Sequence, residues 1–122
     1  MTQYVKRSEF RCPCCGLCHV DDWVVNRFNE ARGIAGVPFI INSGYRCERK
    51  NAQLVATSGA SKTSAHMAGL AADLKAEESG TRFRIVDGLL QAGFLRIGIY
   101  PTFIHADLAH VGKPAPVLFL GR

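Results

Sequence analysis

The stretch SAHMAGLAADL, residues 64–74, places His66 and Asp73 seven positions apart among residues that are almost all small or apolar. Its second half continues into AADLKA (71–76), which predicts a β-strand. The Ala and Gly residues before that strand allow the chain to turn tightly and to pack closely behind whatever His66 and Asp73 hold. We therefore expect these two polar side chains to belong to one site.

Two further strands are predicted downstream, RIGIY (96–100) and FIHADL (103–108), joined around Pro101 and Thr102. His105 and Asp107 are two positions apart on the second of these, so both should project from the same face of the sheet. The alternate positions are apolar and can pack the core: Ile104, Ala106 and Leu108.

The remaining elements follow from apolar spacing and from glycines. HVDDWVVNRFNEARGIAG (19–36) predicts a helix that is capped by Asp21 or Asp22 and ended by Gly33 and Gly36. VPFIINSGY (37–45) predicts a strand by its alternation. Residues 47–63 predict a short helix followed by a loop.

The C-terminal half predicts a second amphipathic helix and a last strand. TRFRIVDGLLQAG (81–93) forms the helix, with these residues expected to face inward: Phe83, Val86, Leu89 and Leu90. The tail 112–122 predicts a loop and then an apolar strand. This order of elements predicts an α+β fold, a small single domain over residues 1–122 with a central antiparallel sheet flanked by helices.

Composition narrows the class of protein. The chain has 122 residues, 48% of them hydrophobic, which is sufficient for one globular core. No apolar run approaches the roughly 18 residues of a membrane span, and no secretory signal is visible at the N-terminus, so we expect synthesis in the cytoplasm. The net charge of +5 favours an anionic partner such as a cell-wall polymer. The basic residues are scattered, which argues against nucleic acid. We expect a monomer.

Four of the five cysteines lie in CPCCGLC (12–18), and the fifth is Cys47. The odd number argues against a disulfide framework. The cluster looks like a metal-binding turn, although a closed structural zinc site usually needs two separated ligand pairs. Only Cys47, with His19 as a further candidate, could complete one. Structural zinc, a transient disulfide and simple buried thiols all remain open, and a zinc knuckle for nucleic acid is a weaker alternative.

The histidines and aspartates fit a catalytic zinc site, which takes three protein ligands and leaves a position for water. His66 and Asp73 supply two ligands, and His105 or His110 supplies the third. Bound water would then ionise near neutral pH. The alternative is that His66 is a hydrogen-bonded residue of the core.

Three segments, INSGYRCERKNAQ (41–53), SAHMAGLAADL (64–74) and GIYPTFIHADL (98–108), together resemble the zinc D-alanyl-D-alanine carboxypeptidase family. That family includes cell-wall endopeptidases and shares its fold with the hedgehog signalling domain. Residues 8–39 also look like its N-terminal part, so the resemblance covers nearly the whole chain. The matching positions are Ser43, Gly44, Tyr45, Arg46, Ser64, His66, Gly69, Ala71, Asp73, His105 and Asp107.

The resemblance implies His66, Asp73 and a later histidine as zinc ligands, and Arg46 as the group that binds a substrate carboxylate. We favour His105 as the third ligand, with Asp107 as general base and His110 as a donor to the oxyanion. The alternative moves zinc to His110 and keeps Asp107 as base. Asp107 could instead be a carboxylate that orients a histidine.

The predicted function is zinc-dependent cleavage of peptidoglycan stem peptides, as a carboxypeptidase or an endopeptidase, with Arg46, Ser64 and Tyr45 holding the substrate. Such an enzyme would act on the cell wall, as a phage lysin or after export by another route. Many relatives carry an acid three residues before the third ligand, where this chain has Thr102. This departure keeps a non-catalytic wall-binding module as the alternative.

Overall fold

The computed structural model describes residues 3–61, 64–109 and 113–121. A 3₁₀ turn, η1 (Arg7–Phe10), precedes the first helix, α1 (Asp22–Ala35). A short strand, β1 (Ile41–Ser43), leads to α2 (Glu48–Ser58). The second half contains these elements: β2 (Ala71–Lys75), α3 (Ser79–Gln91), β3 (Arg96–Ile99), β4 (Phe103–Asp107) and β5 (Val117–Leu120).

The five strands form one sheet in the order β1-β2-β4-β3-β5. The first three pairings in this order are antiparallel, as predicted, whereas β5 pairs with β3 in parallel, so the sheet is mixed. The reason is positional. β5 reverses direction relative to β4, as a hairpin strand would, but β3 already occupies that side of β4, so β5 adds to the outer edge of β3.

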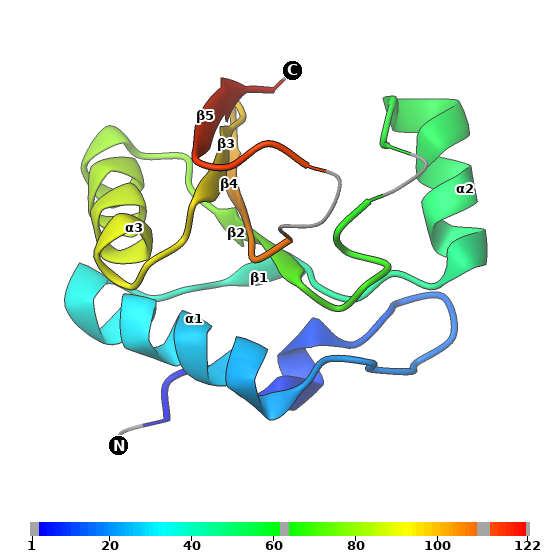
Figure 1. Cartoon of the computed structure of the whole chain (residues 1–122), viewed down its shortest axis with the longest axis horizontal. Coiled ribbons are helices and arrows are strands. Elements are labelled where there is room, and N and C mark those ends of the chain that lie inside the picture. The colour runs from blue at the N-terminus through cyan, green and yellow to red at the C-terminus, as the bar shows by residue number, and fades with distance from the viewer. Residues whose placement is uncertain (1–2, 62–63, 110–112, 122) are drawn as a thin grey trace.

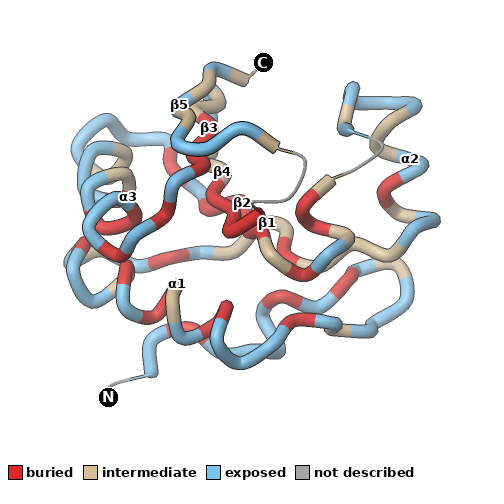
Figure 2. Tube along the Cα trace, in the orientation of Figure 1, coloured by how far each residue is buried: buried red, intermediate tan, exposed pale blue. Residues whose placement is uncertain are grey.

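Helices α1 and α3 lie side by side against one face of the sheet. Helix α2 lies apart from both of them, at the right of the view (Figure 1). Figure 2 shows that buried residues concentrate on the central strands and on the inner sides of α1 and α3. The largest side chains of this core are Phe10, Phe28, Phe94, Leu74, Ile85, Leu89, Ile97 and Ile104. Ile104, Ala106 and Leu108 all belong to it, as the alternation in FIHADL predicts.

Two sequence predictions about helix ends and strand length need correction. α1 runs through Gly33 and ends at Ala35, where Gly36 adopts the left-handed conformation. The strand predicted over residues 37–45 pairs only at Ile41–Ser43. Before Ile41 the pairing ends with one bond, in which the Lys75 N–H donates to the Ile40 carbonyl at 2.9 Å. The alternation persists there, since Phe39 is buried and Ile40 is exposed.

The inward face of α3 matches the predicted one only in part, at Leu89, which is buried, and Val86, which packs against the core. Phe83 and Leu90 are 74% and 58% exposed, and the buried positions are Ile85, Gly88 and Leu89. At Gly88 a side chain would meet the Ala31 carbonyl of α1. The close approach of the two helices at this glycine turns the stripe 85–88–89–92 inward, which leaves Phe83 and Leu90 outside.

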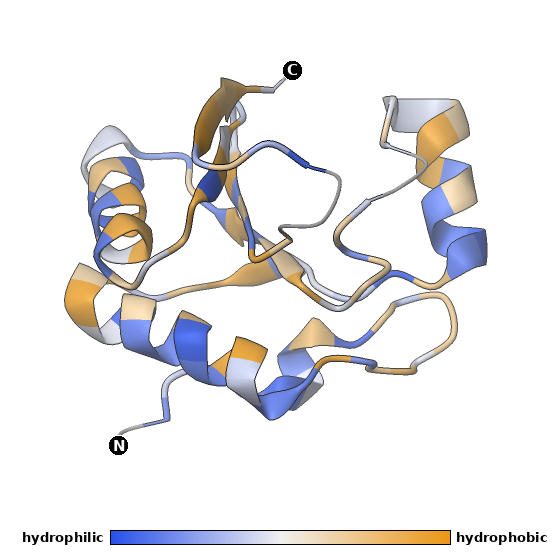
Figure 3. Cartoon of the chain, viewed as in Figure 1, coloured by the Kyte–Doolittle hydropathy of each residue, from blue (hydrophilic) through white to orange (hydrophobic). Residues whose placement is uncertain are grey.

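The strand β5 at the edge of the sheet is hydrophobic (Figure 3), and its Leu118 and Leu120 are exposed. Its Phe119 points the other way and packs over Gly98 of β3. None of the helices in the described part of the chain combines the length and the apolar character needed to cross a bilayer.

Candidate metal centre

A row of residues in register crosses all five strands on the face of the sheet opposite α1 and α3. Ser43 of β1 lies beside Asp73 of β2, which lies beside His105 of β4. His105 in turn lies beside Gly98 of β3, and Gly98 beside Phe119 of β5. The neighbours along β2 and β4, such as Leu74 and Ile104, point into the core. The two-residue period of the strands therefore places Asp73 and His105 together on the outer face.

His66 reaches the same point from the turn over residues 65–69. Gly69 has φ +71°, and a Cβ there would overlap the carbonyl oxygen of His19, so only glycine fits. The His66 Nδ1–H donates to the Gly44 carbonyl oxygen at 2.6 Å. This bond leaves Nε2 of His66 facing Asp73. The small residues of the opening stretch thus let a tight turn present one histidine nitrogen to the sheet.

Three possible ligand atoms converge in the site. His66 Nε2 lies 3.3 Å and His105 Nδ1 lies 3.0 Å from Asp73 Oδ1, and all candidate ligand atoms of the three residues lie within 4.8 Å of one another. Ligand atoms around a tetrahedral zinc, with bonds near 2.0–2.1 Å, are about 3.3 Å apart. The donor types and their spacing therefore fit a zinc ion.

Hydrogen bonds between the side chains set the pKa values of Asp73 and His105. Burial raises the pKa of Asp73, but hydrogen bonds from His105 and His66 outweigh burial and hold that pKa well below its ordinary value. Burial lowers the pKa of His105, but its bonds to Asp107 and Asp73 outweigh burial and raise it. Asp73 is therefore an ionised carboxylate at neutral pH.

Asp107 lies on the far side of His105 from Asp73. Its Oδ2 accepts from His105 Nε2 at 2.7 Å, and its Oδ1 accepts from Arg96 Nε at 2.8 Å and from the Ala109 N–H at 3.0 Å. The residue is 1% exposed. Both oxygens are thus engaged away from the metal position. This geometry favours the orienting carboxylate, which was the alternative, over the general base that the sequence analysis predicts for Asp107.

Arg46 lies on the other side of Asp73. Its Nη2 forms a 3.1 Å ion pair with Asp73 Oδ2, and its Nε donates to Ser43 Oγ at 3.1 Å. Burial lowers the pKa of the guanidinium more than the Asp73 charge raises it, although arginine stays charged at any physiological pH. The positively charged guanidinium of Arg46 thus lies directly beside the proposed ligand Asp73.

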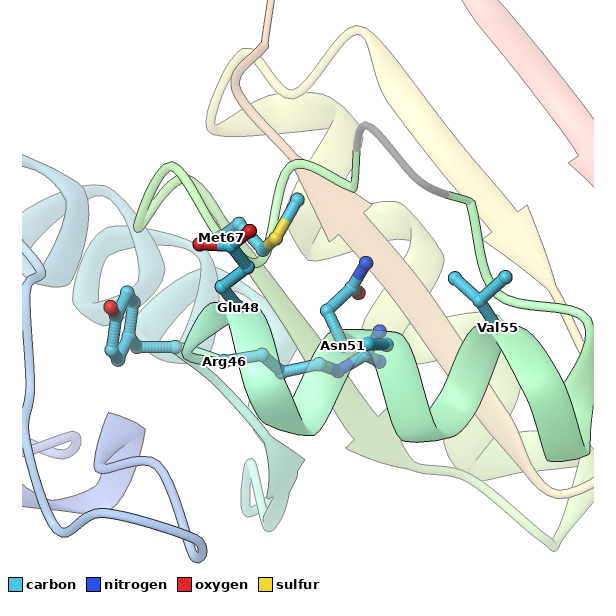
Figure 4. Close-up of a pocket in the computed structure, with 7 residues that line it drawn as sticks. Arg46, Glu48, Asn51, Val55 and Met67 are labelled. Atoms are coloured by element: carbon cyan, nitrogen blue, oxygen red, sulfur yellow. The ribbon is translucent and has the colours of Figure 1, made fainter.

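A cavity of about 560 Å³ opens beside Arg46, between the first turns of α2 and the turn that carries Met67 (Figure 4). Its lining residues are Tyr45, Arg46, Glu48, Asn51, Ala52, Val55 and Met67. Asn51 is 2% exposed, and its Oδ1 has no hydrogen-bond partner among the described residues. The cavity therefore has an apolar wall, the charged guanidinium of Arg46 and the Asn51 oxygen as a possible hydrogen-bond acceptor.

The other predicted site residues have different places. Tyr45 lines the cavity. Ser64 accepts from the backbone N–H of His66 at 3.2 Å through its hydroxyl oxygen, so it supports the turn. His110 lies outside the described residues.

Sequence reasoning missed Tyr100, Arg96 and Phe119. Burial and the charge of Asp73 raise the pKa of Tyr100, and the charge of Arg46 lowers it, so its hydroxyl lies within electrostatic reach of both groups. The Phe119 ring lies 5.9 Å from the His105 ring. Arg96 is in register with Asp107 across the β3–β4 pair. No local spacing links these residues to the motif, because strand pairing alone brings them near it.

Comparisons with known proteins identify the fold and the family of the chain. A structure described as the L-Ala D-Glu endopeptidase ChiX of Serratia marcescens has a similar fold, with a TM-score of 0.55 and 17% identity. The match covers 74% of this chain and 80% of that one. No curated protein matches the chain significantly. The family model described as Peptidase M15 matches residues 6–108, which include every residue of the proposed metal centre, and the chain therefore belongs to the peptidase M15 family.

Proposed function

We propose that this protein is a zinc-dependent peptidase that hydrolyses peptide bonds in peptidoglycan stem peptides. The observation that carries the proposal is the convergence of His66 Nε2, Asp73 Oδ1 and His105 Nδ1 in a chain of the peptidase M15 family. When bound there, zinc would polarise the scissile carbonyl and lower the pKa of a water molecule.

The chain's own residues orient the ligands. The Gly44 carbonyl accepts the Nδ1–H of His66, and the Asp107 carboxylate accepts the Nε2–H of His105. Each bond fixes one tautomer and leaves the other ring nitrogen free to bind metal. Arg96 and the Ala109 N–H in turn keep Asp107 ionised and in place.

Substrate recognition follows from the cavity beside the metal centre. The guanidinium of Arg46 suits a substrate carboxylate, since its planar fork can donate to both oxygens. The Oδ1 of Asn51, which has no hydrogen-bond partner in the part of the chain that the structure describes, can accept from a peptide N–H of the substrate. Stem peptides offer both a carboxylate and a peptide N–H. The solved protein with a similar fold is described as an L-Ala D-Glu endopeptidase. The net charge of +5 would favour binding at an anionic cell wall.

The proposal is tested by incubating the purified protein with peptidoglycan, with and without a chelator, and with zinc added back. We expect new amino groups that vanish on chelation and return with zinc, and mass spectrometry of the products identifies the bond. Cleavage that persists in chelator would refute the zinc mechanism. Binding to the wall without any cleavage would support the wall-binding module instead.

Replacing Asp107 by Asn separates its two possible roles. An orienting carboxylate predicts zinc affinity about 10–100-fold weaker, with most activity restored at saturating zinc. A general base predicts a loss of about 10²–10⁴-fold that zinc does not restore. Zinc titration followed by kcat at saturation gives the answer, with far-UV circular dichroism to confirm folding. We expect the first result.

Replacing Arg46 by Lys keeps the charge and removes the planar fork. We expect KM to rise about 10–100-fold for substrates with a free carboxylate beside the cut bond, equivalent to roughly 1.5–3 kcal/mol. The matched control is the same peptide with that carboxylate amidated, on which wild type and variant should perform alike. An equal loss on both peptides would assign Arg46 to supporting Asp73 alone.

A further inference from the structure

The structure brings together a second group of possible metal ligands, which are cysteine thiols in place of imidazoles and a carboxylate. Cys12 and Cys15 lie in the loop after η1, and Cys47 is the residue that caps the N-terminus of α2. Their sulfur atoms all lie within 4.8 Å of one another. Cys12 is buried, Cys47 half-buried and Cys15 exposed, so the cluster extends from the interior to the surface between the two segments.

The loop from Cys12 to Gly16 has the form of a tight metal-binding turn. The Gly16 N–H donates to the Cys12 carbonyl at 2.8 Å, and the Cys12 N–H donates to the Leu17 carbonyl at 2.8 Å. Gly16 has φ +74°, so the chain reverses there without strain. Cys12 and Cys15 thus share one C-x-x-C turn, the spacing typical of a ligand pair in structural zinc sites.

Backbone N–H groups point at the sulfur atoms. The Cys47 N–H donates to Cys12 Sγ and the Lys50 N–H donates to Cys47 Sγ, both at 3.4 Å. N–H groups placed in this way favour thiolates, and the thiolate is the form that binds metal.

We infer that Cys12, Cys15 and Cys47 bind a structural zinc ion that fastens the N-terminal loop to the start of α2. Thiolates select zinc among the common divalent ions. The three cysteines supply three of the four tetrahedral positions, and water can complete the fourth. Cys18 is excluded from the cluster, because its thiol donates to the Arg7 carbonyl at 3.2 Å.

This ion would also hold part of the substrate cavity in place. Cys47 directly follows Tyr45 and Arg46, which line the cavity. The Tyr45 N–H donates to the Phe10 carbonyl at 2.7 Å, and the Arg46 N–H donates to the His66 carbonyl at 3.2 Å. The segment 45–47 therefore connects the two metal positions, although the inference stands on the cysteine geometry and does not require peptidase activity.

The test uses the full chain, purified with reductant and loaded with Co²⁺. We expect a thiolate-to-cobalt charge-transfer band in wild type, and the same band in Asp73→Asn, which lacks a ligand of the other centre. Cys18→Ser is the matched control and should keep the band and the zinc content. The double variant C12S/C15S should lose the band and hold one zinc ion fewer than wild type.

Two results would overturn the inference, and the first needs no variant. Reduced wild type that shows no charge-transfer band has no thiolate metal site, and a matching deficit of free thiols before reduction would assign the cysteines to a disulfide. A band that survives in folded C12S/C15S would place the metal elsewhere. Chelator-sensitive cleavage of peptidoglycan is measured separately, in wild type and in Cys18→Ser, and neither result above changes it. Failure of the cysteine site is therefore distinguishable from failure of the proposed function.

Discussion

Asp73→Asn is expected to abolish zinc binding at the proposed centre and to reduce kcat/KM on peptidoglycan peptides by about 10³-fold or more. Asn preserves the shape of the side chain but removes the negative charge. Asp73 Oδ1 is the atom that both histidine nitrogens face, and Asp73 Oδ2 pairs with Arg46. Loss of metal assistance worth about 4 kcal/mol in the transition state corresponds to about 10³-fold in rate.

The measurement combines zinc content with steady-state kinetics, and Asp87→Asn is the matched control. Asp87 is exposed on α3 and accepts from Gln91 at 3.0 Å, away from the site. The same chemical change there should leave zinc content and activity within about twofold of wild type, because exposed positions contribute little. An Asp73→Asn protein that is folded, contains full zinc and cleaves at the wild-type rate would remove the metal mechanism.

Gly69→Ala is expected to have the largest effect on stability, lowering the free energy of unfolding by about 3 kcal/mol or more. Two costs combine at this position. The left-handed conformation at φ +71° costs an L-residue about 1–2 kcal/mol. The added methyl group would also overlap the His19 carbonyl oxygen, a backbone atom that cannot rotate away. The turn must open, and His66 moves with it.

Gly59→Ala isolates the first cost. Gly59 ends α2 with φ +70°, and a Cβ there meets no atom within 4 Å. This variant should lose only the 1–2 kcal/mol or so of backbone strain. Urea unfolding curves of both variants give the difference, and zinc titration should show weaker binding in Gly69→Ala alone. Equal losses of unfolding free energy in the two variants would show that the loop carrying His19 moves aside for the added methyl group at little cost.

Local patterns predicted most of the elements because burial imposes a period on the sequence. FIHADL alternates along β4, with Ile104 and Ala106 in the core and His105 and Asp107 on the outer face. Asp21 and Gly36 occupy the cap positions at the two ends of α1, although the Asp21 side chain makes no capping hydrogen bond. Two of the four residues predicted to face inward on α3 do so, since Leu89 is buried and Val86 packs against the core. Phe83 and Leu90 have the spacing of a buried stripe but are exposed, because the contact at Gly88 turns another stripe inward.

The direction of β5 lay beyond local patterns as well, because pairing partners depend on which edge of the sheet is free. The same holds for Tyr100 and Arg96, which reach the site through the pairing and crossing of strands. Their contacts join residues that no periodicity relates.

By itself, the sequence determined the chemistry that this chain can perform: the donor types, the tight turn at Gly69 and the two-residue spacing that puts His105 and Asp107 on one face. Only the tertiary structure decided how the donors are used. Cross-strand register set Asp73 beside His105 and Arg96 beside Asp107, and turned the Asp107 carboxylate away from the metal position. The physical reason is that residue types follow from local burial and backbone geometry, whereas distances between segments follow from how the strands pair.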